Sequence, residues 1–136
     1  MNIHNGGSLH PHLPVVLGTS LHRAGHPGDS RDTTHMVMAS EAAKFLGLSA
    51  SDSAWVTSHH HQGIDQLSSG LQAWAYAPDG LIEGIRRLDT VNFPCYLGIQ
   101  WHPERSEEGQ SLVESIGSYF LSAARTRAMT QAQLAK

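Results

Sequence analysis

The sequence predicts an α/β fold in which several short strands precede one long closing helix. Short apolar, β-rich segments alternate with turn signals between residues 35 and 100, and helical periodicity begins near Leu112. The chain has 136 residues, of which 40% are hydrophobic, enough to build the core of one domain. The net charge of −3 argues against a strongly basic nucleic-acid surface as the main theme.

The first 33 residues carry little apolar periodicity. They are rich in Gly, Pro, His and Ser, and residues 5–8 and 26–29 have the composition of turns. Compact domains seldom begin with so long a loop. We therefore expect this segment either to be mobile or to pack against something that the chain lacks.

Two strands and a short helix are predicted next. Residues 35–38 and 54–57 are apolar enough for buried strands. Between them, Ser40 is positioned to cap a helix over residues 41–46, and Gly47 is positioned to end it.

A hairpin is predicted around the turn signal at residues 78–80, whose sequence is Pro-Asp-Gly. The strand before it, residues 71–77, alternates small apolar residues with Gln72, Trp74 and Tyr76. We expect Trp74 and Tyr76 to pack against a helix or another element rather than to stack on a ligand. The returning strand covers residues 81–85.

A last strand is predicted over residues 93–100, followed by the closing helix. The helix has an apolar stripe, with Glu107 and Glu108 in its first turn and Arg125 and Arg127 late, as the helix dipole favours. We expect the end of the chain to fray. The stripe consists of Leu112, Val113, Ile116, Phe120, Ala123 and Ala124.

Several classes of protein are disfavoured. No run approaches the 18 apolar residues of a membrane span, and the first residues do not resemble a signal peptide. A single cysteine cannot form an internal disulfide, so the expected location is the reducing cytoplasm.

The segment from Gly98 to Glu104, with the sequence Gly-Ile-Gln-Trp-His-Pro-Glu, carries the clearest chemistry. An apolar strand delivers His102 to its carboxyl end, where α/β sheets place their ligands, and Glu104 follows two residues later. A carboxylate beside an imidazole fixes its tautomer and stabilises its protonated form, which is half of a catalytic triad. On these residues alone, a histidine that merely satisfies a turn is an equal alternative.

Four segments resemble one known family in order and spacing. Residues 98–104 resemble the G-[VI]-Q-[WF]-H-P-E signature of class I glutamine amidotransferase-like domains. Residues 55–63 and 77–85 resemble the W-V-N-S-x-H-x-Q-G segment and the P-D-G hairpin of the γ-glutamyl-γ-aminobutyrate hydrolases. Residues 5–10 resemble the G-G-[ST]-L segment that follows the nucleophile helix of that family.

The resemblance implies a flavodoxin-like α/β domain that hydrolyses a γ-glutamyl amide through a cysteine thioester, in putrescine and polyamine catabolism. It makes His102 the general base and acid and Glu104 its orienting carboxylate. It also places Ser58 and His59 at the glutamyl moiety of the substrate, although Thr57 stands where the subfamily usually has asparagine.

The family nucleophile is missing. It is a cysteine in a G-x-C-x-G elbow, and the chain contains no such elbow. The one cysteine, Cys95, is predicted to be a small buried residue inside the strand that leads to His102. We therefore expect residues 1–125 to be the C-terminal half of a family domain, beginning at the end of the nucleophile helix, with residues 126–136 as a tail.

The 10 histidines do not predict a metal site. The N-terminal ones are irregularly spaced in a loop-rich segment, and residues 59–61 are explained by the family motif without a metal. We expect no metal and no cofactor. The N-terminal histidines are His4, His10, His12, His22 and His26.

Four functions remain open, of which a histidine-rich metal-binding protein is the most distant. The first is a cysteine-dependent γ-glutamyl hydrolase whose C-terminal half is inactive alone. The second is a glutamine amidotransferase (glutaminase) fragment, and the third is a non-catalytic half-domain that pairs with a separate N-terminal chain or with itself through an open sheet edge. The expected partners are a small γ-glutamyl substrate and that missing half, with no nucleic acid and no membrane.

Overall fold

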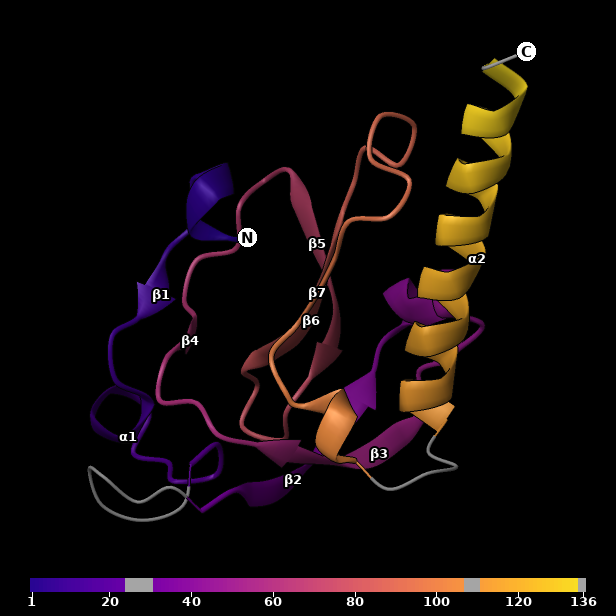
Figure 1. The fold of residues 1–136 in the computed structure, drawn as a ribbon. Coiled ribbons are helices and arrows are strands. Elements are labelled where there is room, and N and C mark those ends of the chain that lie inside the picture. Colours follow the sequence, from indigo (N-terminus) through magenta and orange to yellow (C-terminus); the bar gives the residue numbers. More distant parts are fainter. Residues whose placement is uncertain (24–30, 107–110, 135–136) are drawn as a thin grey trace.

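A curled five-stranded sheet forms the centre of the computed structural model, which describes residues 1–23, 31–106 and 111–134 (Figure 1). The strands lie in the order β3-β2-β5-β6-β7, and each neighbouring pair is antiparallel. Their bounds are β2 Thr33–Ala39, β3 Ser53–Ser58, β5 Leu71–Tyr76, β6 Ile82–Arg87 and β7 Leu97–Ile99.

The N-terminal segment packs along one side of this sheet, where it pairs with a later part of the chain. It contains the 3-10 helix η1 (Ile3–Asn5), the strand β1 (Leu9–His10) and the short helix α1 (Leu13–Val16). Strand β1 pairs with β4 (Gly63–Ile64) in a second, two-stranded sheet.

Asn2 anchors this segment. Its amide nitrogen donates to the carbonyl oxygens of Ser8 and Gln66 at 2.9 Å each, and its Oδ1 accepts from the Ser68 backbone at 3.0 Å. Asn2 is buried, so these bonds satisfy groups that water cannot reach. Residues 1–23 are therefore packed on residues 60–83 of the same chain rather than forming a free loop.

The predicted short helix is confirmed as the 3-10 helix η2 (Glu41–Leu46). The Ser40 hydroxyl accepts from the Ala42 backbone at 3.2 Å, as an N-cap does. At the other end Gly47 adopts φ 75°, a left-handed conformation in which a side chain would be strained.

The core between the sheet and the helices is built around Trp74, which has no exposed surface. Its ring meets those of Phe45, on η2, and Trp101 edge-on, with centroids 6.1 and 5.8 Å away. Trp74 thus packs against a helix, as predicted. The long helix α2 (Ser111–Leu134) covers this core with Leu112 and Ile116.

The predicted hairpin is also confirmed. Strands β5 and β6 pair across the turn at residues 78–80, where Gly80 has φ 85°. The Asp79 carboxylate accepts from the Leu81 backbone at 3.2 Å, which is the bond expected of aspartate in a turn.

The strand predicted over residues 93–100 is wrong in its first half, because only Leu97–Ile99 forms β7. Asp89 accepts hydrogen bonds from the backbones of Val91 and Asn92 and bends the chain into a loop, and Pro94 has no N–H to donate to a ladder. Cys95 lies in this loop and is exposed, so the prediction of a buried cysteine inside a strand is also wrong.

Helix α2 extends further than expected. It continues to Leu134 through most of the predicted tail, because that stretch contains good helix formers and neither proline nor glycine. Of the predicted apolar stripe, Leu112 and Ile116 are buried, whereas Phe120 is 61% exposed. The predicted first-turn residues Glu107 and Glu108 lie outside the described residues.

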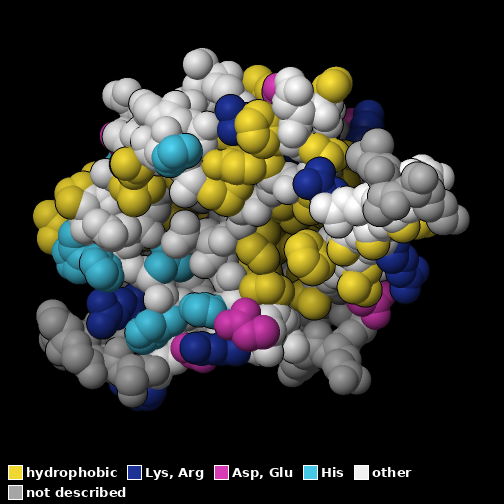
Figure 2. All heavy atoms as spheres, turned by 45° about the horizontal axis from the view of Figure 1, so that its top comes forward, with side chains coloured by type: hydrophobic (Ala, Val, Ile, Leu, Met, Phe, Trp, Pro, Cys, Tyr) yellow, Lys and Arg dark blue, Asp and Glu magenta, His cyan; other side chains and the backbone are white. Residues whose placement is uncertain are grey.

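The surface shows where side-chain types gather. Hydrophobic side chains collect around the middle of one face, and histidines are grouped along one side of it (Figure 2). Across the described parts of the chain, no helix is both long and apolar enough to span a membrane.

Two glycine-to-alanine substitutions test this packing. A Cβ on Gly84 would lie 2.5 Å from the Trp74 ring, whereas a Cβ on Gly117 of α2 meets nothing within 4 Å. We expect Gly84→Ala to lower the free energy of unfolding by about 1–3 kcal/mol through overpacking. Gly117→Ala should raise the free energy of unfolding by about 0.5–1 kcal/mol, because alanine loses less backbone conformational entropy than glycine when the helix folds. Urea unfolding measures both, and a stabilising Gly84→Ala would contradict the packing around Trp74.

Candidate active site

The backbone around His102 is fixed from two strands. Just after β7, the Gln100 N–H donates to the Glu83 carbonyl of β6 at 2.9 Å. The His102 N–H donates to the Thr57 carbonyl of β3 at 2.8 Å. A short 3-10 helix, η3 (Pro103–Arg105), begins directly after His102. The histidine therefore leaves the sheet at a defined point.

The predicted pair of His102 and Glu104 is formed. His102 Nδ1 lies 2.8 Å from Glu104 Oε1, and the two side chains are 32% and 63% exposed. The backbone N–H of Glu104 and the hydrogen bond from His102 hold the pKa of this carboxyl below its ordinary value. A histidine that donates from Nδ1 to a carboxylate keeps the lone pair of Nε2 for accepting a proton.

Further polar contacts hold η3 against the end of β3. The Thr57 hydroxyl donates to the Arg105 carbonyl at 3.1 Å. The Arg105 guanidinium donates to Asp32 at 2.8 Å, and its Nε lies 3.8 Å from Glu104. These ion pairs are partly solvated, so they position the segment more than they stabilise the fold.

The two other predicted site residues differ in their surroundings. Ser58 has no exposed surface, and its hydroxyl donates to the His22 carbonyl at 3.0 Å. His59 is partly exposed, and its Nδ1 lies 3.1 Å from the Arg31 carbonyl and 3.9 Å from Asp32. His59 and Arg105 thus both approach Asp32, whereas the Ser58 side chain makes its hydrogen bond inside the protein.

Cys95 does not complete a triad. It precedes β7, whereas His102 follows it, and the β6–β7 loop and η3 lie at opposite ends of that strand (Figure 1). Cys95 lines a surface groove between the loop and α2 together with residues such as Phe93 and Tyr119.

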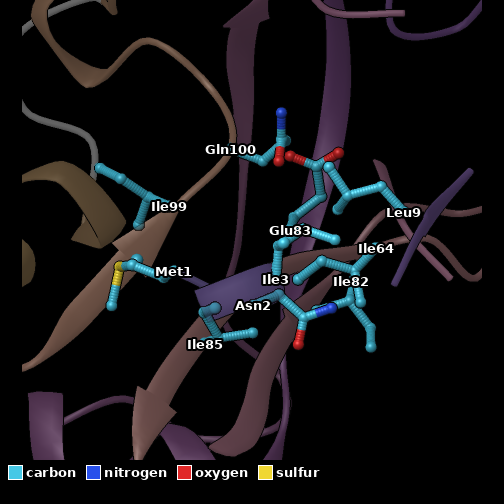
Figure 3. Close-up of a pocket in the computed structure, with 11 residues that line it drawn as sticks. Met1, Asn2, Ile3, Leu9, Ile64, Ile82, Glu83, Ile85, Ile99 and Gln100 are labelled. Carbon is cyan, nitrogen blue, oxygen red and sulfur yellow. The ribbon is translucent and has the colours of Figure 1, made fainter. Parts of the chain in front are cut away.

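A cavity of about 300 Å³ lies on the β6–β7 face, but it does not enclose His102 or Glu104. The Glu83 and Gln100 side chains lie on the same side of it, and most of the other lining residues are apolar (Figure 3).

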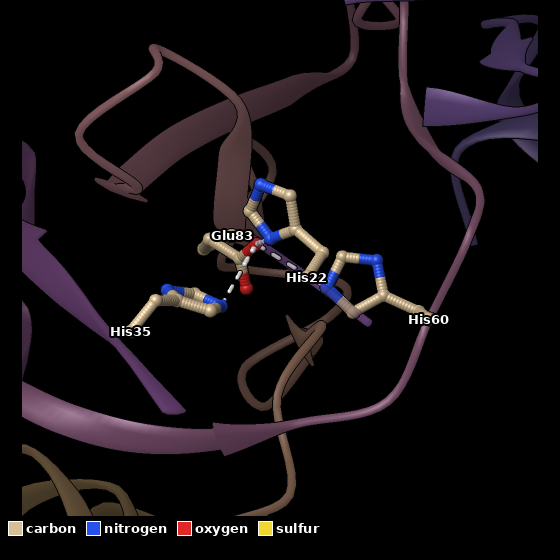
Figure 4. Close-up of side chains that lie close together, drawn as sticks. All are labelled: His22, His35, His60 and Glu83. Carbon is tan, nitrogen blue, oxygen red and sulfur yellow. Dashed lines mark ion pairs between the residues drawn. The ribbon is translucent and has the colours of Figure 1, made fainter. Parts of the chain in front are cut away.

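Four residues that the sequence analysis did not connect meet in the interior. His22, His35, His60 and Glu83 each offer a ligand atom, and these atoms lie within 4.8 Å of one another (Figure 4). The group could hold a metal ion.

Electrostatics in this group centre on the carboxylate. Burial opposes its charge, but contacts with His22 and His60 hold the pKa of Glu83 below its ordinary value. Burial also acts to lower the pKa of His22, yet Glu83 and Asp79 raise it overall. Burial lowers the pKa of His35.

No local motif identifies this group, because its members come from four separate segments. His22 follows α1, His35 lies on β2, His60 follows β3 and Glu83 lies on β6. The signals in the sequence were the number of histidines and a glutamate flanked by Leu81, Ile82 and Ile85 in a strand.

Comparison with known proteins agrees with the motifs. The family model described as Peptidase C26 matches residues 1–104. A candidate glutamine amidotransferase of Mycobacterium tuberculosis is 38% identical over 116 residues, covering 85% of this chain and 35% of that protein. The protein NtpR of Enterococcus hirae is 33% identical over 121 residues, covering 89% of this chain and 49% of that protein.

The γ-glutamyl-γ-aminobutyrate hydrolase PuuD of Escherichia coli is 38% identical over 69 residues, covering 51% of this chain and 26% of that protein. Where relatives match over most of the chain, the chain spans 35 to 49% of their length.

A solved structure confirms the fold class. A candidate GMP synthase component from Thermoplasma acidophilum superposes with a TM-score of 0.60 at 18% identity, covering 96% of this chain and 55% of that one. The mixed α/β architecture of a glutamine amidotransferase-like domain is therefore present.

The geometry of the histidine–carboxylate pair can be tested by titration. In His102→Ala the Glu104 carboxyl loses the imidazole that favours its charged form, so we expect its pKa to rise toward the ordinary value. Carbon-detected NMR measures this directly. The Asp52 carboxyl, whose pKa is lowered by bonds from Ser49, is the control and should not change. An unchanged Glu104 titration would contradict the pairing.

Proposed function

The chain belongs to the peptidase C26 family of glutamine amidotransferase-like proteins, and we propose that it supplies the acid–base half of a γ-glutamyl hydrolase. The observation that carries the proposal is the 2.8 Å contact between His102 Nδ1 and Glu104 Oε1. Its substrate class is a γ-glutamyl amide, as in the name of the partly matching Escherichia coli hydrolase.

The proposed roles follow from the contacts. Glu104 orients the imidazole, so that Nε2 of His102 takes the proton of an attacking thiol and then gives it to the leaving amine. Because Glu104 remains ionised, it also stabilises the imidazolium that forms between these two steps. The Thr57 carbonyl positions the backbone on which this exchange depends.

The nucleophile, in this proposal, comes from outside these 136 residues. The sequence has no G-x-C-x-G elbow, and Cys95 lies in a loop at the other end of β7 from His102. A nucleophile needs to lie within hydrogen-bond reach of its base. We therefore expect these residues alone to be inactive and to need a nucleophile-bearing segment, in the same chain or in another.

Recognition of the glutamyl group is proposed for the end of β3. The partly exposed imidazole of His59 is accessible to a carboxylate of the substrate. The Ser58 hydroxyl already donates to the His22 carbonyl, so its contribution would come from the backbone.

A second candidate function is the glutaminase step of an amidotransferase. It is favoured by the Mycobacterium tuberculosis relative, which matches 85% of the chain, whereas the hydrolase matches 51%. Both functions use the same acid–base pair, so they differ in the substrate: glutamine for one, a substituted γ-glutamyl amide for the other. A half-domain that only pairs with a separate chain would hydrolyse neither.

The test joins the chain to a nucleophile. Residues 1–136 are fused behind the nucleophile-bearing N-terminal part of the Escherichia coli hydrolase, cut where the counterpart of Met1 begins, and glutamate release is measured with γ-glutamyl-γ-aminobutyrate and with glutamine. We expect the isolated chain to release none above background and the folded fusion to be active. His102→Ala should lower kcat of the fusion by at least about 100-fold, the usual contribution of acid–base catalysis.

His4→Ala removes an exposed histidine far from η3 in sequence and should leave kcat unchanged. Circular dichroism establishes that each fusion is folded. Enzymatic turnover by the isolated chain would overturn the requirement for an external nucleophile. Full activity in His102→Ala would overturn the role of the pair.

A further inference from the structure

The carboxylate of Glu83 is enclosed by three imidazoles in the interior of the protein. Glu83 and His35 side chains are 0% exposed, His22 is 1% exposed and His60 is 11% exposed. Glu83 Oε1 lies 3.1 Å from His22 Nδ1, 3.4 Å from His60 Nε2 and 3.9 Å from His35 Nε2. A buried carboxylate requires compensation of its charge, since desolvation penalises an isolated ion heavily.

Hydrogen bonds do not supply that compensation. Both oxygens of Glu83 and the three facing ring nitrogens are buried without a hydrogen-bond partner of acceptable geometry among the described residues. Native proteins rarely leave so many buried polar atoms unpaired in one place, and a bound ion is one standard reason. Five unpaired atoms in one small buried cluster therefore indicate a cation.

The opposite nitrogen of each imidazole is occupied. His22 Nε2 lies 2.9 Å from Asp79 Oδ2, His35 Nδ1 lies 3.1 Å from the Met36 carbonyl, and His60 Nδ1 lies 2.8 Å from the Gln62 carbonyl. Because these partners only accept, each neutral ring donates outward and turns a lone pair toward Glu83. Metal-ligating histidines are oriented in this way by carboxylates and backbone carbonyls.

The spacing of the ligand atoms can be adapted to a small tetrahedral ion by a moderate contraction. Zinc binds imidazole nitrogen at about 2.0–2.1 Å, which separates neighbouring tetrahedral ligands by about 3.3 Å. The contacts of 3.1 and 3.4 Å to Glu83 already fit this separation, and His35 lies 3.9 Å away. Because the four ligand atoms lie within 4.8 Å of one another, the widest pair has to close by at most about 1.5 Å around the ion.

We propose that His22 Nδ1, His35 Nε2, His60 Nε2 and one oxygen of Glu83 form a structural zinc site. Three imidazoles and a carboxylate are ligands that Zn²⁺ favours, and four protein ligands leave no open position for a substrate. The ion joins the N-terminal segment to β2, β6 and the end of β3. Its role is therefore to stabilise the fold rather than to take part in the hydrolysis.

The site and the candidate active site share one strand. The His22 carbonyl accepts from the Ser58 hydroxyl and from the His60 backbone, both at 3.0 Å. One residue before Ser58, the Thr57 carbonyl holds the His102 backbone. Bound zinc therefore fixes the end of β3 from which His102 is positioned.

Metal binding is tested on the untagged 136-residue chain after chelation of its metals. Isothermal titration with Zn²⁺ alone should show one ion per chain with a dissociation constant below about 1 μM. Added Zn²⁺ should also raise Tm, because it binds only the folded state. Co²⁺ in place of Zn²⁺ should give the intense visible bands of tetrahedral coordination.

Neighbouring histidines provide the matched variants. His60→Ala removes the most exposed ligand and should weaken Zn²⁺ binding by more than about 100-fold, whereas His61→Ala, at an exposed position outside the cluster, should leave it unchanged. Asp79→Asn replaces the carboxylate that faces His22 and keeps an oxygen that can accept from the Leu81 backbone, so a loss of about 10- to 100-fold is expected.

The Co²⁺ spectrum of the unaltered chain keeps the proposal falsifiable even if a variant fails to fold. No micromolar binding, an octahedral Co²⁺ spectrum, or equal losses in His60→Ala and His61→Ala would each overturn it. None of these measurements depends on hydrolytic activity, so they stand apart from the proposed function.

Discussion

The buried charge of Glu83 is the constraint on which the arrangement of the other elements depends. Its side chain has no exposed surface and lies near the start of β6, between Ile82 and Gly84. To place a carboxylate there, the fold brings His22, His35 and His60 from three separate segments around it. The backbone of the same residue accepts from Gln100 and so holds the end of β7 as well.

From this point the contacts lead to the candidate active site. The His22 carbonyl holds Ser58 and His60, and the Thr57 carbonyl holds His102, so β3 connects the buried group to the exposed His102–Glu104 pair. The two groups are suited to different tasks. The exposed His102–Glu104 pair can exchange protons with a substrate. The buried group around Glu83 can hold a charge, because interactions between charges are stronger where water is excluded.

Residues close together in the sequence were the ones whose structure could be predicted. Ser40 and Gly47 marked both ends of η2, the turn at Asp79 and Gly80 marked the hairpin, and the spacing of His102 and Glu104 anticipated their contact. Each depends on an interaction between near neighbours, such as a cap, a turn or a strand-end pair. The identity of the family also followed from short motifs and is confirmed.

Features that depend on contacts between residues far apart in the sequence were not predicted. The ligands around Glu83 come from positions 22, 35, 60 and 83, and no spacing rule connects them. Cys95 looked like part of an apolar strand, but the Asp89 turn and Pro94 keep it in an exposed loop. Phe120 fitted the helical stripe, yet α2 has already passed the end of the core at that position, and the side chain is exposed.

Anomalous X-ray diffraction from crystals of the untagged chain grown with zinc tests most directly the claim that a cation compensates Glu83. Data collected on both sides of the zinc absorption edge should show one peak among His22 Nδ1, His35 Nε2, His60 Nε2 and the Glu83 carboxylate. No anomalous peak there, with an imidazolium or a water molecule hydrogen-bonded to Glu83 instead, would contradict the account.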